Sequence, residues 1–351
     1  MASHSLKKGW IWGMLIAIGM VIAIVGSTAL SSLSAATTTT KFSYTVEDLG
    51  TLGGKNSYAH SINNAGKAVG YSETSSGDRH AVLWEKGKKI DLGTLGGKES
   101  FAFDINNAGK VVGAAFISNG GSHAVLWDKG KIIDLATGVL ISNSQANAIN
   151  NAGKVVGESQ YIGGRSEAVL WDKGIQIDLE TTGGDISSAT GINNAGKVVG
   201  YIFPWPNWYY AVLWHKGKKI DLGTLGGVYS NALAINNAGK VVGYSGTSSG
   251  ASHAVLWVKG KKIDLGTLGN DHSVALSINN AGKVVGYSKT SSDNNHAVLW
   301  NNNSIKDLNN LIPPQSGWVL NFARDINDKG QIVGSGKING QTHAFLLTPV
   351  K

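Results

Sequence analysis

The chain has 351 residues, of which 42% are hydrophobic and 15% are charged, so it is long enough to bury a large core. It contains no cysteine, which excludes disulfide bonds, cysteine-ligated zinc and a thiol nucleophile. Its 48 glycines recur at fixed spacing among Val, Ile, Trp and Thr, which is typical of an all-β protein with many tight turns. The formal net charge is +8.

The N-terminal segment has the pattern of an export signal. Lys7 and Lys8 precede an uncharged apolar run over residues 9–30, and Ser34-Ala35-Ala36 offers a cleavage site of small residues. We therefore predict that residues 1–36 are a signal peptide or, since the run is about long enough to span a bilayer, an N-terminal membrane anchor. Residues 37–41 would then be a linker. The rest of the chain is expected to be secreted or outward-facing, and membrane-tethered if the segment is not cleaved.

Residues 42–351 contain seven copies of one unit. Each copy has an Ile-Asn pair, then a glycine four places after the Ile, then Val-Gly. A repeat of about 43 residues indicates a propeller or a solenoid. The seven isoleucines are Ile62, Ile105, Ile149, Ile192, Ile235, Ile278 and Ile326.

Each copy supplies four short extended runs. Strand A ends at the Ile, strand B carries Val-Val-Gly, strand C is Ala-Val-Leu-Trp, and strand D is Ile-Asp-Leu. An Asn-x-Gly turn connects strand A to strand B, and a Lys-Gly turn connects strand C to strand D. Glycine supplies the positive φ that tight hairpins need. The Ala three places before the Ile suits an inner strand near an axis, and the Trp suits packing between blades. Four strands in about 43 residues match one propeller blade.

The two ends of the repeat region are complementary fragments. Residues 45–54 supply strand D and its exit loop alone, and residues 343–347 supply a strand C without its strand D. We therefore predict an all-β, seven-bladed β-propeller with four antiparallel strands per blade, closed by pairing of the N- and C-terminal strands. A three-sheet β-helix is the alternative architecture, although a linear stack would need capping units.

The repeat resembles the HAF family of probable extracellular repeat proteins. The resemblance rests on His343-Ala344-Phe345, on the Asp-Leu-Gly-Thr-Leu-Gly-Gly and Ile-Asn-x-x-Gly-x-Val-Gly runs, and on Leu308 to Pro313 leading to Ser316-Gly317-Trp318. Several copies have Val where the family motif has Phe. The match covers about residues 42–351. It implies export and a repeat architecture, and it transfers no catalytic residue.

Basic residues gather in the turns that a propeller places on one face, namely the A–B and C–D turns. Clustered positive charge attracts polyanions, so this face is a candidate for contact with an anionic envelope polymer. The alternative is that lysine is a solvated turn residue copied by duplication. Nucleic acid is not expected as a partner, because the face has almost no arginine and no interleaved aromatic residues. The A–B candidates are Lys67, Lys110, Lys154, Lys197, Lys240 and Lys283.

One B–C loop is unlike the others, which are small and polar. It runs from residue 203 to residue 210 and is rich in large aromatic residues. Exposed apolar patches often mark binding sites, and flat aromatic faces suit a sugar ring, so we predict a glycan site here. The alternative is that these side chains fold back over the edge of the blade. The candidate residues are Phe203, Trp205, Trp208, Tyr209 and Tyr210.

The remaining polar residues do not form a recognisable catalytic or metal motif. A His opens strand C in five copies and strand D carries an Asp in all seven, but groups spread around a ring are expected to satisfy backbone groups within their own blade or the next. We therefore predict no catalytic residues, no metal site and no cofactor. The strongest sign of catalysis is the pair Asp104 and Asp325, which precede the strand A Ile and could approach the axis.

These observations predict a monomeric, non-catalytic extracellular binding module. Its partner would be a glycan, an envelope polymer or a protein that binds one face of the propeller. The alternative function is a secreted hydrolase or lyase acting on polysaccharide, because fold alone does not decide function.

Overall fold

The computed structural model describes residues 42–350 except 137–140, 163, 180–185, 205–207 and 303. The predicted signal or anchor (1–36), the linker (37–41) and Trp205 lie outside the described residues. Phe42–Lys351 forms one compact unit. Among the described residues there is no helix with the length and apolar character needed to cross a membrane.

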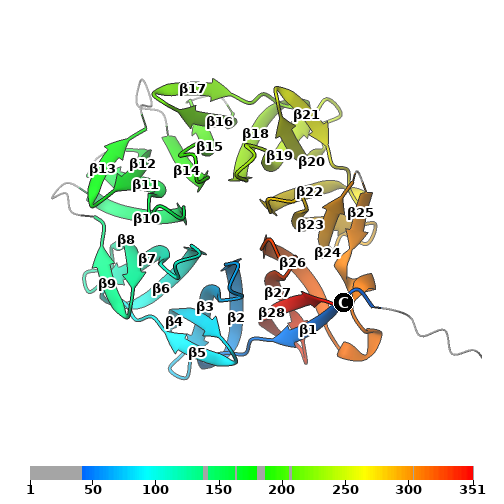
Figure 1. The fold of residues 1–351 in the computed structure, drawn as a ribbon, viewed down its shortest axis with the longest axis horizontal. Coiled ribbons are helices and arrows are strands. Elements are labelled where there is room, and N and C mark those ends of the chain that lie inside the picture. The colour runs from blue at the N-terminus through cyan, green and yellow to red at the C-terminus, as the bar shows by residue number, and fades with distance from the viewer. Residues whose placement is uncertain are drawn as a thin grey trace, which may run out of the picture. The chain divides into compact units, whose positions relative to one another are not determined.

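The described strands form seven blades of four antiparallel strands each, which surround a central opening (Figure 1). Blade 1 comprises β2 (Gly53–Ile62), β3 (Ala68–Thr74), β4 (Arg79–Glu85) and β5 (Lys88–Asp91). Blade 2 comprises β6 (Gly96–Ile105), β7 (Val111–Ile117), β8 (Ser122–Asp128) and β9 (Lys131–Asp134). Blade 3 comprises β10 (Ile141–Ile149), β11 (Val155–Tyr161), β12 (Ser166–Asp172) and β13 (Ile175–Asp178).

The second half of the ring repeats this order. Blade 4 comprises β14 (Ile186–Ile192), β15 (Val198–Phe203), β16 (Tyr210–His215) and β17 (Lys218–Asp221). Blade 5 comprises β18 (Gly226–Ile235), β19 (Val241–Thr247), β20 (Ser252–Val258) and β21 (Lys261–Asp264). Blade 6 comprises β22 (Gly269–Ile278), β23 (Val284–Thr290), β24 (Asn295–Asn301) and β25 (Ser304–Asp307). Blade 7 comprises β26 (Val319–Ile326), β27 (Ile332–Ile338), β28 (Gln341–Pro349) and β1 (Tyr44–Asp48).

The A–B turns form where the sequence places Asn and Gly. In blade 1 the side-chain Oδ1 of Asn63 accepts hydrogen bonds from the backbone N–H groups of Ala65 and Lys67, both at 3.0 Å. Gly66 adopts a φ of 84°, which a residue with a side chain rarely adopts. The turn therefore closes on the Asn side chain, and the chain returns directly into strand B.

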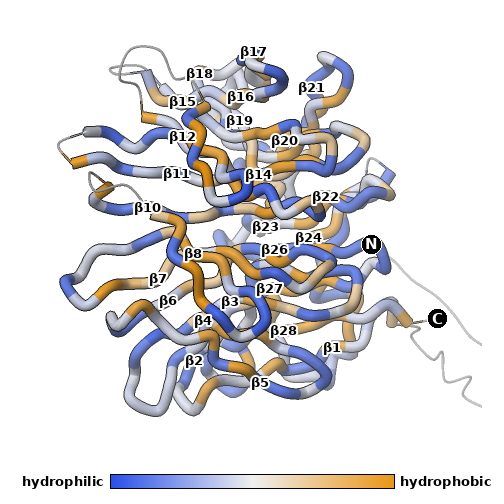
Figure 2. The backbone as a smooth tube through the Cα atoms, turned by 60° about the vertical axis from the view of Figure 1, so that its left-hand side comes forward, coloured by the Kyte–Doolittle hydropathy of each residue, from blue (hydrophilic) through white to orange (hydrophobic). Residues whose placement is uncertain are grey.

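The hydrophobic core lies between neighbouring blades. Trp84 of blade 1 is 3% exposed and belongs to a cluster that includes Val333 and Ala344 of blade 7. Trp127 of blade 2 packs in the same way with residues of blade 1. Figure 2 shows hydrophobic residues within the strands and hydrophilic residues in many connecting turns. The predicted role of the Trp in packing between blades is confirmed.

The ring closes in the way that the sequence predicted. Strand β1 pairs antiparallel with β28, with Val46 opposite Leu347. A second set of contacts confirms the closure, because the first Asn of each A–B turn donates from Nδ2 to the backbone carbonyl of the matching Asn in the next blade. This chain of hydrogen bonds starts at Asn63 and returns to it through Asn106, Asn150, Asn193, Asn236, Asn279 and Asn327. The structure is therefore a closed propeller, and not a β-helix.

Blade 7 departs from the regular spacing. The connection from β25 to β26 contains two short 3-10 helices, η1 (Leu308–Leu311) and η2 (Pro314–Ser316). Leu308 is fully buried and Trp318 is 9% exposed, in one cluster with Phe345. The extra residues of this repeat thus extend the core at the place where the two chain ends meet.

Candidate functional site

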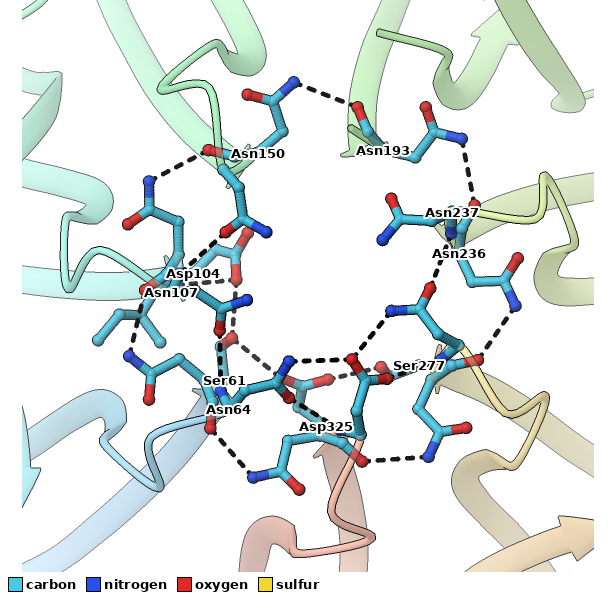
Figure 3. Close-up of a pocket in the computed structure, with 18 of the residues that line it drawn as sticks. Ser61, Asn64, Asp104, Asn107, Asn150, Asn193, Asn236, Asn237, Ser277 and Asp325 are labelled. Carbon is cyan, nitrogen blue, oxygen red and sulfur yellow. Dashed lines mark hydrogen bonds between the residues drawn. The ribbon is translucent and has the colours of Figure 1, made fainter. Parts of the chain in front are cut away.

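The A–B turns form the mouth of the central channel on one face of the propeller. A cavity of about 180 Å³ lies here, lined mainly by the paired asparagines of the turns (Figure 3). The second Asn of each turn receives a hydrogen bond on Oδ1 from the backbone N–H of the preceding turn, as Asn107 does from Asn64 at 2.9 Å. These bonds also complete a circle, through Asn64, Asn107, Asn151, Asn194, Asn237, Asn280 and Asp328.

Deeper in the channel, two carboxyl groups meet at one hydroxyl. Ser61 Oγ lies 2.7 Å from Asp104 Oδ1 and 2.9 Å from Asp325 Oδ2, although it carries a single proton to donate. Asp104 also accepts from the backbone N–H of Ile149 at 2.8 Å, and Ser277 Oγ donates to Asp325 at 2.5 Å. The two carboxyl groups therefore connect blades 6, 7, 1, 2 and 3 across the channel wall.

Enclosure in this channel shifts the titration of its polar groups. Burial raises the pKa of Asp104 to about 6, and hydrogen bonds from Ile149 and Ser61 oppose part of that rise. Burial also raises the pKa of Asp325. Burial lowers the pKa of the nearby His60 to about 4, helped by the positive charge of Arg324. A protonated Asp104 can donate to Ser61 while the Ser61 hydroxyl donates to Asp325, so that one carboxyl proton for the two aspartates satisfies all three groups.

The repeated His and Asp residues pair within single blades. His80 Nδ1 lies 2.8 Å from Asp91 Oδ2, and the other oxygen of Asp91 accepts from the backbone N–H of Gly93. The same pairing joins His123 to Asp134, His253 to Asp264, His296 to Asp307, and His343 to Asp48. The sequence predicted that each His and Asp would satisfy backbone groups of its own blade or the next. The Asp does so, but the His binds the side chain of the Asp instead. The described residues contain no group of three or more His, Asp or Glu side chains placed to hold a metal ion.

The six A–B lysines divide into two sets. Lys67 forms an ion pair with Glu85 at 3.0 Å, because the residue that ends strand C in blade 1 is acidic. Matching pairs join Lys110 to Asp128 and Lys154 to Asp172. The position of Glu85 holds His215, Val258 and Asn301 in blades 4, 5 and 6, so Lys197, Lys240 and Lys283 have no such carboxylate. The positive charge of the A–B turns is therefore less compensated over blades 4 to 6.

The aromatic loop lies on the opposite face, at the B–C ends of the blades. Trp208 is 61% exposed and Tyr209 is 42% exposed. Tyr209 packs edge-on against Tyr201 at 5.2 Å and lies over Phe203 at 4.8 Å, so part of the loop does fold onto its own blade. Tyr210 is half-buried and packs against the core between blades 3 and 4.

The adjacent blade completes this surface. Trp208 lies 6.4 Å from Tyr229 of β18, and Tyr229 lies 6.3 Å from Tyr244 of β19. The backbone N–H of Ser230 donates to the carbonyl of Tyr209 at 3.0 Å, which fixes the loop to blade 5. We call Tyr201, Phe203, Trp208, Tyr209, Tyr229 and Tyr244 the aromatic cluster. The sequence offered no sign of the two blade 5 residues, because they occupy ordinary strand positions far along the chain.

The fold is similar to solved propeller structures. The β-propeller domain of the Trilobed protease from Pyrococcus furiosus, described as having an open velcro topology, matches with a TM-score of 0.58 and 11% identity, over 88% of this chain and 98% of that domain. An acylaminoacyl peptidase in complex with a chloromethyl ketone matches with a TM-score of 0.55 and 12% identity, over 88% and 52% of the two chains. The acylaminoacyl peptidase of Pyrococcus horikoshii matches with a TM-score of 0.54 and 12% identity, over 84% of this chain and 52% of that chain.

The chain thus spans about half the length of the two peptidases. No protein-family model matches the sequence, and no curated protein matches it. At identities of 11 to 12% the structural similarity establishes the fold and nothing about the chemistry. On this evidence the chain is an all-β protein with the fold of a seven-bladed β-propeller.

Proposed function

We propose that this protein is an extracellular, non-catalytic carbohydrate-binding module that binds glycans through the aromatic cluster. The observation that carries the proposal is Trp208, which exposes 61% of its surface beside Tyr229 of the next blade. Large exposed aromatic residues are costly to leave in water and commonly mark a binding surface. The basic and apolar N-terminal segment supports the extracellular location.

The chemistry of the cluster suits a sugar. The apolar face of a pyranose ring packs against a flat aromatic ring, and polar groups at the edge bind its hydroxyls. Asn231 lies beside the cluster, with its Nδ2 3.4 Å from the Tyr244 hydroxyl, but the residue is only 8% exposed. Binding at the cluster would therefore depend mainly on the exposed rings.

The test is a glycan array screen of the purified protein, followed by titration of each positive glycan with Trp fluorescence as the signal. We expect Trp208→Ala to weaken binding at least about tenfold, a loss of about 1.4 kcal/mol. Ile162→Ala is the matched control, because Ile162 is 67% exposed beyond β11, in the B–C region of blade 3. Unchanged affinity in both Trp208→Ala and Tyr229→Ala would refute the proposed site.

Polysaccharide hydrolysis or elimination is the second candidate function, and one observation favours it. Asp104 and Asp325 share Ser61 within the channel, and a carboxyl group with a pKa of about 6 is suited to donating a proton. The assay is glycan cleavage across pH 4 to 8. If the pair is catalytic, Asp104→Asn and Asp325→Asn will each abolish turnover while leaving glycan binding at the aromatic cluster intact.

A further inference from the structure

The mouth of the channel presents a set of amide donors with a fixed direction. The Oδ1 atom of each second asparagine is held by the backbone N–H of the preceding turn, so the Nδ2 atom is directed elsewhere. Figure 3 shows the carboxamides of Asn64, Asn107 and Asn237 turned into the opening. The mouth is therefore lined by N–H donors whose orientation is set by the fold.

One carboxylate of the chain already uses these donors. Asp328 takes the place of the second asparagine in blade 7, and its Oδ2 accepts from Nδ2 of Asn64 at 2.9 Å and of Asn280 at 3.0 Å. Four further amide nitrogens have no hydrogen-bond acceptor in the described part of the chain, and they belong to Asn107, Asn151, Asn194 and Asn237. Asp328 thus shows which chemical group the remaining donors accommodate.

Two of the lysines that form no ion pair within the described residues belong to the same turns as two of these donors. Lys197 and Lys240 follow Asn194 and Asn237 in the A–B turns of blades 4 and 5. Each reaches toward the next turn, since a Cβ built on Gly282 would lie 3.1 Å from Lys240 Nζ, and one on Gly239 would lie 3.5 Å from Lys197 Nζ. The A–B turns of blades 4 and 5 therefore combine free amide donors with nearby positive charge, and neither lysine lines the cavity itself.

We propose that the channel mouth over blades 4 and 5 is a second binding site, and that its ligand is an acidic polysaccharide. A uronate carboxylate would accept hydrogen bonds from Nδ2 of Asn194 and Asn237, with Lys197 and Lys240 supplying charge nearby. Asp328 shows that a carboxylate fits among these donors, although it lies between the turns of Asn64 and Asn280 and not between adjacent turns. The site lies at the opposite end of the blades from the aromatic cluster and does not depend on glycan binding there.

The residues that line the mouth favour a uronate polymer over a cation or an acidic peptide. A cation would need oxygen ligands, but the Oδ1 atoms are already engaged by backbone N–H groups. An acidic peptide would ordinarily anchor an apolar side chain, and the accessible lining of this cavity is almost wholly polar. A uronate polymer has one carboxylate and several hydroxyls per unit, which matches a ring of repeated amide donors.

The test uses the full chain and oligogalacturonate as the probe, measured by calorimetry at low and moderate salt. We expect binding that weakens with salt, and a loss of at least tenfold in the double variant Asn194→Ala/Asn237→Ala. Lys240→Gln should weaken binding about threefold, and the matched control Lys67→Gln should leave it unchanged, because Lys67 is already paired with Glu85. Melting temperatures verify that each variant is folded.

Three results would overturn the proposal. The first is that the wild type does not bind oligogalacturonate, or that the double variant binds it with the same affinity as the wild type. The second is equal binding of neutral galactose oligomers, which would remove the role of the carboxylate. The third is equal or tighter binding of polyglutamate, which would assign the site to acidic peptides instead. Trp208→Ala should not change oligogalacturonate affinity, so failure of this site and failure of the aromatic cluster are distinguishable.

Discussion

At the residue scale, the channel shows how a single position can change the chemistry of a repeat. The residue before the strand A Ile is polar in blades 1, 2, 6 and 7, as Ser61, Asp104, Ser277 and Asp325, but Ala or Gly in blades 3 to 5. Ser61 binds both aspartates, Ser277 binds Asp325, and the channel encloses them. Each would be unremarkable alone. Burial in the channel, with a smaller contribution from the charge of Asp325, raises the pKa of Asp104 to about 6, while the hydrogen bond from Ser61 opposes that rise.

Asp104 predicts a definite pH dependence of stability. Its pKa is raised in the folded protein from 3.8 to about 6, so the folded state binds this proton more tightly than the unfolded chain does. The contribution of this proton to the stability of the folded protein is fully present below about pH 4 and is lost as the pH rises through about 6. Relative to Asp104→Asn, we expect the wild type to be more stable at pH 4 than at pH 7, by about 2 kcal/mol.

The measurement is urea unfolding of both proteins from pH 4 to pH 7.5. The two proteins must be compared because His60 changes the stability with pH in the opposite direction. Its pKa is lowered to about 4 in the folded protein, so its protonation favours unfolding as the pH falls. His60 is present in both proteins, so its contribution cancels. A difference in stability that stays constant with pH would contradict the shared-proton arrangement.

At the scale of the strand pair, the glycine of each Val-Gly motif has a steric role. Gly243 on β19 lies opposite Ala232 on β18, next to a shift in register between Ala232 and Ala234. A Cβ built on Gly243 would lie 1.9 Å from the carbonyl oxygen of Asn231. The equivalent distance in blade 1, from Gly70 to the Tyr58 carbonyl, is also 1.9 Å. Glycine is therefore required because the bulged strand A presses its backbone onto strand B.

We expect Gly243→Ala to destabilise the protein by about 3 kcal/mol or more, because the backbone of β18 or β19 must move to admit the methyl group. The measurement is the midpoint of urea unfolding. Gly164→Ala is the matched control, since its Cβ would make ordinary contacts of 3.4 Å with Tyr161, and it should change stability by less than about 0.5 kcal/mol. Equal midpoints for the two variants would show that the bulge relaxes freely.

At the scale of the whole molecule, the closed ring depends on one noncovalent strand pair. Strand β1 joins β28 with Thr45 opposite Thr348, residues that are far apart in the sequence. The two circles of asparagine hydrogen bonds add to this closure at the channel mouth. Opening the ring would break these contacts together, so closure and global stability should be coupled.

A disulfide across the closing strands should therefore stabilise the protein. Opposed residues of antiparallel strands have Cα atoms about 4.5–5.5 Å apart, which a disulfide can span. We expect oxidised Thr45→Cys/Thr348→Cys to gain about 3 kcal/mol, because the bond closes a very long loop in the unfolded chain. The chain has no other cysteine, so only one intramolecular pairing is possible.

The control disulfide is Lys337→Cys/Thr342→Cys, which joins opposed residues within the β27–β28 hairpin and closes a short loop. It should add much less stability than the long-range bond. Both variants are compared with and without reductant by thermal unfolding. If the long-range disulfide fails to form in the folded protein, the pairing of β1 with β28 is contradicted.

The sequence alone determined the number of blades, the order of strands and the pairing of the two ends. These features are local or repeated, since each turn carries its own Asn and Gly and each core position recurs in every copy. The pairing of His with Asp inside a blade is also a repeated feature, but from the sequence we expected these groups to bind the backbone.

Only the tertiary structure decided which residues of different blades meet. The sequence grouped six lysines together, but acidic residues that end strand C form ion pairs with three of them. It predicted a site formed by one aromatic loop, but Tyr229 of the next blade extends the aromatic cluster. It left Asp104 and Asp325 apart, whereas ring closure brings blades 7, 1 and 2 around Ser61. The physical reason is that the sequence encodes each blade locally, while the candidate sites lie between blades.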